Sequence, residues 1–152
     1  MNEPIVSRIL RAALYGIFAT GVVLVVTLPF MLDIYLGFLR DSYSAEPGYR
    51  TFILIFLTGA GIPGLWVVFE MIRMLRTIRD GPFVARNVRA LNRTGCVFLA
   101  LAAAFLGKCL LYVTIMTLLC GILFIVCGLF AFTLGHLFRQ AVAFREENDL
   151  TI

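Results

Sequence analysis

Four long apolar stretches separated by short polar ones dominate this chain. A helix needs about 20 apolar residues to cross roughly 30 Å of hydrocarbon, because lipid offers no partner to a free backbone N–H or C=O. Residues 12–32 and 51–69 contain no charged side chain, and residues 94–138 contain a single formal charge. The pattern therefore predicts four membrane-spanning helices.

The spans are expected at about residues 9–32, 51–70, 94–113 and 118–138, with a tight turn near Thr114 to Thr117 between the last two. Apolar side chains at helical spacing on both sides of Asp80-Gly81-Pro82-Phe83 predict a short cytoplasmic helical hairpin over residues 70–93. Residues 139–152 form a tail that extends the last helix. The predicted fold class is all-α, an integral membrane four-helix antiparallel bundle in one domain over residues 1–152.

Composition agrees with a membrane protein. Hydrophobic residues make up 61% of the 152 residues and charged residues 14%, with a mean hydropathy of +0.97. Soluble domains have about half apolar and about a quarter charged residues, so a soluble enzyme of ordinary design is excluded. Disorder is excluded as well, because disordered chains combine weak hydrophobicity with high net charge.

Basic residues predict the orientation, because Lys and Arg resist translocation far more than Asp and Glu do. Ten arginines flank the predicted spans on one side, whereas Arg40 and Arg50, plus Lys108, belong to the other. Both termini are therefore expected in the cytoplasm. A cleaved signal peptide is the competitor for the first span, but its apolar region would be about 7 to 15 residues with a cleavage site close behind.

Six of these arginines flank the Asp80–Phe83 turn, within 21 residues. They are Arg73, Arg76, Arg79, Arg86, Arg89 and Arg93. One interpretation is that they fix topology and contact membrane lipids, including anionic headgroups. The more specific interpretation is that they form a binding surface for an acidic cytoplasmic partner or regulator. No direct contact with nucleic acid is expected, because a recognisable reading element is missing.

The centre of the second span holds Gly59, Pro63 and Gly64, where a helix kink is expected because Pro63 cannot donate a hydrogen bond to Gly59. Ala60 and Gly64 form a small-xxx-small pair, which favours close helix packing in lipid. The alternative is a broken helix whose freed carbonyls line a substrate or ion site, as in secondary transporters.

Lys108 is the candidate intramembrane charge. Its stem is long enough to carry the ammonium outward to the interface, and this snorkelling is the simpler interpretation. The alternative is a functional Lys108, paired with Asp33 at the outer surface.

The remaining candidate chemistry is sparse. The cysteines at positions 96, 109, 120 and 127 fall inside predicted spans, without the close spacing that metal or redox sites use. His136 lies at the end of the last span with no Ser, Cys or Asp near it in sequence to complete a catalytic set. We therefore expect no enzyme, no cofactor and no metal.

Two segments resemble a known family. The run Asp80-Gly81-Pro82-Phe83 with the later Asn87, Leu91, Asn92 and Gly95, and the tail from Phe144 to Ile152, are similar to a bacterial family of multi-pass membrane proteins catalogued as domain of unknown function 2975. The resemblance implies an inner-membrane protein with four helices. It also implies a link to small helix-turn-helix regulators, and it supplies no catalytic residues.

The expected function is that of an interaction or regulatory partner acting at the cytoplasmic face, with a helix-turn-helix regulator as one candidate partner. The alternative is a subunit of a homo-oligomeric transporter or channel for a small solute or ion. Four spans would enclose a pathway only with help from further copies.

Overall fold

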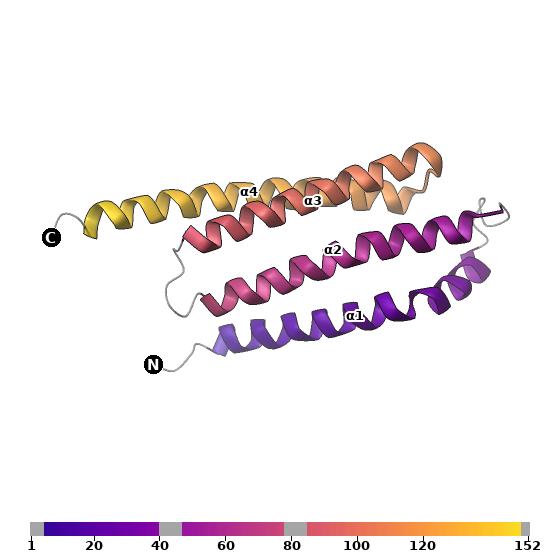
Figure 1. The fold of residues 1–152 in the computed structure, drawn as a ribbon, viewed down its shortest axis with the longest axis horizontal. Helices are drawn as coiled ribbons and strands as arrows, with labels where there is room; N and C mark the ends of the chain where they lie inside the picture. The colour runs from indigo at the N-terminus through magenta and orange to yellow at the C-terminus, as the bar shows by residue number, and fades with distance from the viewer. Residues whose placement is uncertain (1–4, 40–46, 78–84, 150–152) are drawn as a thin grey trace. The chain divides into compact units, whose positions relative to one another are not determined.

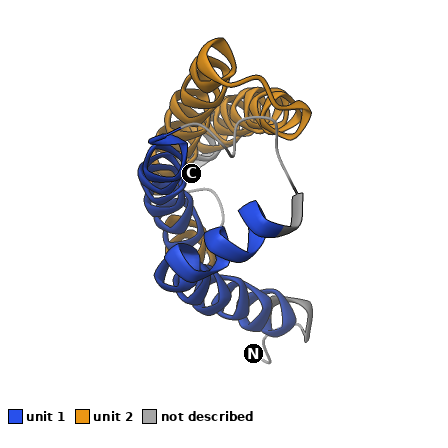
Figure 2. Ribbon diagram, turned by 90° about the vertical axis from the view of Figure 1, so that its right-hand side faces the viewer, with its two compact units in different colours: residues 1–69 blue, residues 70–152 orange. Residues whose placement is uncertain are grey.

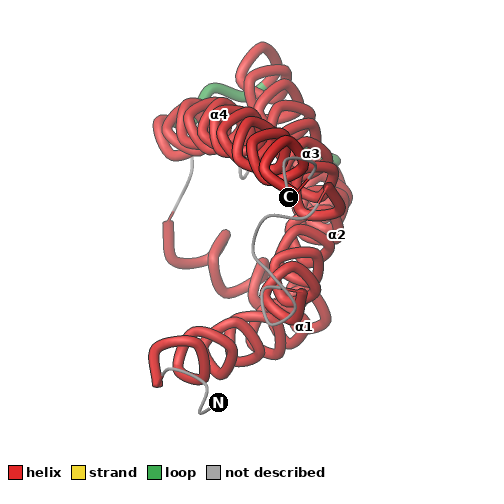
Figure 3. The backbone as a smooth tube through the Cα atoms, turned by 90° about the vertical axis from the view of Figure 1, so that its left-hand side faces the viewer, coloured by secondary structure: helices red, strands yellow, loops and turns green. Residues whose placement is uncertain are grey.

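The computed structural model describes residues 5–39, 47–77 and 85–149, and it consists of four helices (Figures 1 and 3). They are α1 (Ile5–Leu39), α2 (Tyr49–Thr77), α3 (Ala85–Leu111) and α4 (Ile115–Asp149). All four are long and apolar enough to cross a membrane. The all-α fold class is confirmed, and the chain is a multi-pass membrane protein.

The helices are longer than the apolar stretches that predicted them. Helix α1 continues through Pro29 and beyond Asp33 to Leu39, so the polar loop expected from Asp33 onward begins later. Hydropathy marks only the part that crosses hydrocarbon, whereas a helix continues as long as its backbone bonds are made. The same reasoning explains the predicted extensions of α2 and α4, which are confirmed as far as Thr77 and Asp149.

The chain divides into two compact units, residues 1–69 and 70–152 (Figure 2). In the first unit, α1 and the first part of α2 form an antiparallel hairpin. Gly48, with φ +100°, makes the turn before α2, in a backbone conformation that glycine adopts readily. Beside that turn, Arg50 donates two hydrogen bonds to Asp33, from Nε at 2.6 Å and from Nη2 at 2.9 Å. This bidentate pair holds the ends of the two helices together.

The second unit contains the antiparallel hairpin of α3 and α4. Helix α3 ends with a bond from the Tyr112 N–H to the Lys108 carbonyl, and α4 begins with one from the Leu118 N–H to the Thr114 carbonyl. The turn is therefore Tyr112 to Thr114, and the prediction near Thr114 to Thr117 was a few residues late.

Three glycines of α4, each seven residues from the next, let α3 approach closely. A Cβ atom on Gly128 would lie 3.0 Å from Leu99 Cδ2 and 3.3 Å from the Gly95 carbonyl oxygen. A Cβ on Gly121 would meet Leu106 at 3.1 Å. A Cβ on Gly135 would meet a side-chain oxygen of α3 at 2.7 Å. Because hydrocarbon does not drive helices together, such close contact is how they associate in lipid.

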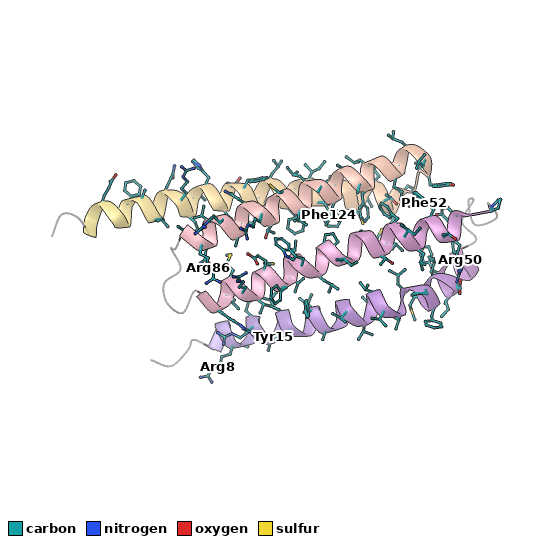
Figure 4. All side chains as sticks on the ribbon, viewed as in Figure 1. Arg8, Tyr15, Arg50, Phe52, Arg86 and Phe124 are labelled. Atoms are coloured by element: carbon teal, nitrogen blue, oxygen red, sulfur yellow. The ribbon has the colours of Figure 1, made fainter. Side chains whose placement is uncertain are left out.

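Aromatic side chains also make contacts between α3 and α4. The Phe124 ring, labelled in Figure 4, stacks on Phe98 with centroids 6.1 Å apart and meets Phe105 edge-on at 5.2 Å. Buried positions on α4 are spaced by four, seven, three and four residues, so they lie on one face of the helix. They include Thr117, Gly121, Gly128, Ala131 and Gly135.

We predict that Gly128→Val lowers the free energy of unfolding by about 1 to 3 kcal/mol, because the new side chain must displace Leu99 and the backbone at Gly95. Gly107→Val is the matched control, since a Cβ there meets nothing within 4 Å. Denaturant titration in mixed micelles measures both variants. Equal destabilisation would show that helix propensity, rather than close packing, explains the effect.

Candidate functional site

The last turns of α2 and the first turns of α3 line a polar pocket of about 220 Å³ within the second unit. Figure 4 labels Arg86 at the start of α3. The pocket is lined by Glu70, Arg73, Arg86, Arg89, Ala90 and Arg93. Four guanidinium groups therefore surround one space.

Helix α3 places three of the arginines by its own periodicity. Arg86, Arg89 and Arg93 are separated by three and four residues, so they lie on one face of the helix. All three are exposed, whereas Ala90 on the same face is buried. The small alanine side chain leaves room between the long arginine side chains that surround it.

Helix α2 contributes Glu70 and Arg73, three residues apart. Arg73 Nη1 lies 4.0 Å from Glu70 Oε2, the outer limit of an ion pair. The Glu70 side chain is only 9% exposed, while that of Arg73 is 52% exposed. Among the described residues that line this pocket, Glu70 is the one carboxylate beside four arginines, so positive charge is in excess there.

The electrostatics of α3 add to this excess. The amino-terminal end of a helix carries a partial positive charge, which acidic side chains commonly offset. The first turn of α3 contains none. Arg86, in the first turn of α3, lies near the positive end of the helix dipole, and the four arginines of the lining suit the binding of an anionic group.

The structure brings together four of the six arginines singled out in the sequence. Arg76 is exposed at the end of α2 but does not line the pocket. Arg79 and the Asp80–Phe83 turn lie outside the described residues. In the sequence, Glu70 lies at the end of the predicted second span, and it was not among the candidate site residues. Its position three residues before Arg73 was the available signal.

The glycine and proline segment of α2 lies elsewhere. Helix α2 is unbroken through Pro63, so the broken-helix interpretation gains no support, and the kink stays a prediction. A Cβ on Gly59 or Gly64 would meet nothing within 4 Å, whereas one on Gly61 would lie 2.9 Å from Val25 Cγ2. Close packing against α1 therefore occurs at Gly61, and close packing at the Ala60 and Gly64 pair stays a prediction.

Lys108 does not extend outward as the snorkelling interpretation expected. Lys108 is only 7% exposed. Its Nζ donates a hydrogen bond to Thr117 Oγ1 at 2.8 Å, across the α3–α4 hairpin. The ammonium also lies in the last turn of α3, where the helix dipole favours a positive charge. Asp33, the partner considered for it, instead accepts two hydrogen bonds from Arg50.

Of the four cysteines, Cys96 is exposed and the other three are half-buried, and all four thiols are free. His136 Nε2 lies 3.2 Å from Gln140 Nε2, one helical turn further along α4. Within the described ranges no group of three His, Cys, Asp or Glu side chains is placed to hold a metal ion.

We predict that Thr117→Val lowers the free energy of unfolding by about 1 to 2 kcal/mol, because the buried Lys108 ammonium loses a hydrogen-bond acceptor. Thr133→Val is the control, since the exposed Thr133 hydroxyl donates only to the Leu129 carbonyl of its own helix. Denaturant titration compares them. A control as destabilised as the test variant would contradict a structural role for the Lys108 bond.

A family model described as a protein of unknown function, DUF2975, matches residues 35–152, from the last part of α1 through α4. The match includes the arginine-lined pocket and Lys108. Searches of the curated proteins and of the solved structures returned no match. Because the matched region covers most of the sequence, the family resemblance noted in the Asp80–Phe83 run and the tail is confirmed, and the chain belongs to the DUF2975 family.

Proposed function

We propose that this protein is a membrane-embedded interaction or regulatory partner that presents its arginine-lined pocket to the cytoplasm. The observation that carries the proposal is that four arginines, from α2 and α3, line one pocket together with the buried Glu70. Such a concentration of charge at the end of apolar helices is a recognition surface for an anionic group.

The cytoplasmic location follows from the distribution of basic residues. Arg8 and Arg11 near the start of α1, Arg139 on α4 and the pocket arginines belong to the side with ten arginines, and Arg50 belongs to the other. The positive-inside rule then places both termini and the pocket in the cytoplasm. In a bacterial cell, the membrane concerned is the inner one.

The proposed partner is an acidic surface of a cytoplasmic protein, with a small helix-turn-helix regulator as the candidate that the family resemblance suggests. Guanidinium groups match carboxylates with two parallel hydrogen bonds, and a basic patch speeds the encounter with an acidic one. Anionic headgroups near the pocket would add about 1 kcal/mol of attraction per basic side chain.

The alternative is transport by a homo-oligomer, for which Pro63 and Lys108 were the candidate residues. Helix α2 is continuous through Pro63, and the Lys108 ammonium is hydrogen-bonded inside its hairpin. Neither residue offers the unwound backbone or mobile charge that transport sites use. We therefore favour interaction over transport.

The proposed orientation predicts that a reporter fused at either terminus is active only inside the cell. A cysteine introduced for Gly48, in the α1–α2 turn, should react with an impermeant maleimide added outside intact cells. A cysteine introduced for Arg139 serves as the control and should react only after the cells are opened. Reversed labelling of the two positions would contradict the orientation.

The proposed interaction predicts that Arg86→Gln, Arg89→Gln and Arg93→Gln, combined in one chain, reduce recovery of the cytoplasmic partner by about tenfold or more, because charge-assisted hydrogen bonds are lost. Co-purification from native membranes, quantified by mass spectrometry, measures this. Arg139→Gln, which replaces an exposed arginine outside the pocket lining, is the control. Unchanged partners in the triple variant would refute the pocket as the interaction surface.

A further inference from the structure

We propose that the arginine-lined pocket is a binding site for a phosphomonoester group, carried by a membrane lipid or by a soluble phosphate. This inference rests on the proposed function, because it assigns a ligand class to the same pocket. It is carried by the four guanidinium groups around one space, the buried Glu70 and the position at the start of α3.

The pocket needs an anion for electrostatic reasons. Arg86, Arg89 and Arg93 follow one another on one face of α3, so their like charges repel. Arg86 also lies in the first turn of α3, near the positive end of the helix dipole, which disfavours cations. Glu70 offsets one positive charge, and it lies at the 4.0 Å limit from Arg73 Nη1. A bound anion with more than one charge relieves the remaining repulsion.

The geometry favours phosphate over a single carboxylate. A phosphomonoester presents three acceptor oxygens and carries a charge of about −1.5 to −2 at neutral pH, whereas a carboxylate has two oxygens and one charge. The arginines that line the pocket come from both α2 and α3. Every cation in the lining is an arginine, the residue suited to bidentate phosphate contacts.

Replacing Glu70 tests the proposal, because the expected change in phosphate affinity has a definite direction. Its carboxylate is in the wall of the pocket and has the same charge as the ligand. Replacing Glu70 by glutamine keeps the shape of the side chain and removes that charge. Phosphate should therefore bind more tightly to the Glu70→Gln variant and less tightly to variants that lack an arginine.

The test uses the purified full chain in nanodiscs of zwitterionic phosphatidylcholine, titrated with inorganic phosphate in a calorimeter. Arg89→Gln is expected to weaken binding by about tenfold or more, and Glu70→Gln to tighten it by about threefold to tenfold. Arg139→Gln is the matched control and should bind as the wild type does. Opposite shifts from two neighbouring substitutions separate ligand binding from general loss of structure.

A second arm distinguishes the sources of phosphate. Nanodiscs that also contain phosphatidic acid should lose the calorimetric signal for inorganic phosphate if the lipid headgroup fills the pocket, and native mass spectrometry should then show retained phosphatidic acid. An unchanged signal identifies a soluble phosphate as the ligand. Either result supports the phosphate site, provided that Arg89→Gln abolishes it.

The proposal is overturned if neither source binds the wild type, or if Arg89→Gln and Arg139→Gln bind alike. Binding of a glutamate-rich peptide that depends on Arg89, without any binding of phosphate or phosphatidic acid, would also overturn it and would leave the proposed interaction with an acidic protein standing. Loss of the protein partner in the pocket variants tests that broader function separately.

Discussion

Backbone hydrogen bonding in lipid is the constraint on which the structure depends. Hydrocarbon provides no partner for peptide groups, so each span must be a helix that satisfies its own backbone. Lipid also removes the hydrophobic reason for helices to associate, which leaves van der Waals contact between closely spaced surfaces. The seven-residue repeat of Gly121, Gly128 and Gly135 provides such contact, and the Phe124 ring adds contacts with two aromatic rings of α3.

The same constraint concentrates charge at helix ends. Lys108 is buried near the end of α3, where a threonine hydroxyl of α4 and the helix dipole stabilise its ammonium. Glu70 is buried in α2, among arginines instead of hydroxyl groups. The charge of Lys108 is therefore stabilised within the α3–α4 hairpin. The pocket that contains Glu70 has positive charge in excess, and this difference is why we propose a binding function for the pocket and not for Lys108.

Several features could be predicted from the sequence because they depend on local pattern. The four apolar stretches gave the number of spans, and the spacing of Arg86, Arg89 and Arg93 placed them on one face. The seven-residue glycine repeat of α4 is also a local pattern that is visible in the sequence. The direction of the Lys108 side chain and the contribution of Glu70 to the pocket depend on which helix faces which. Such contacts join residues of separate helices, and hydropathy carries no information about them.

The most direct test of the central claim, that arginines of α2 and α3 share one pocket, is cross-linking of paired cysteines in bilayers. In a chain whose four native cysteines are replaced, Arg73→Cys with Arg89→Cys should be joined efficiently by a short bifunctional maleimide, because both residues line the same pocket of about 220 Å³. Arg76→Cys with Arg93→Cys should be joined poorly, because Arg76 is outside that lining. Equal yields for the two pairs, or none for the first, would contradict the shared pocket.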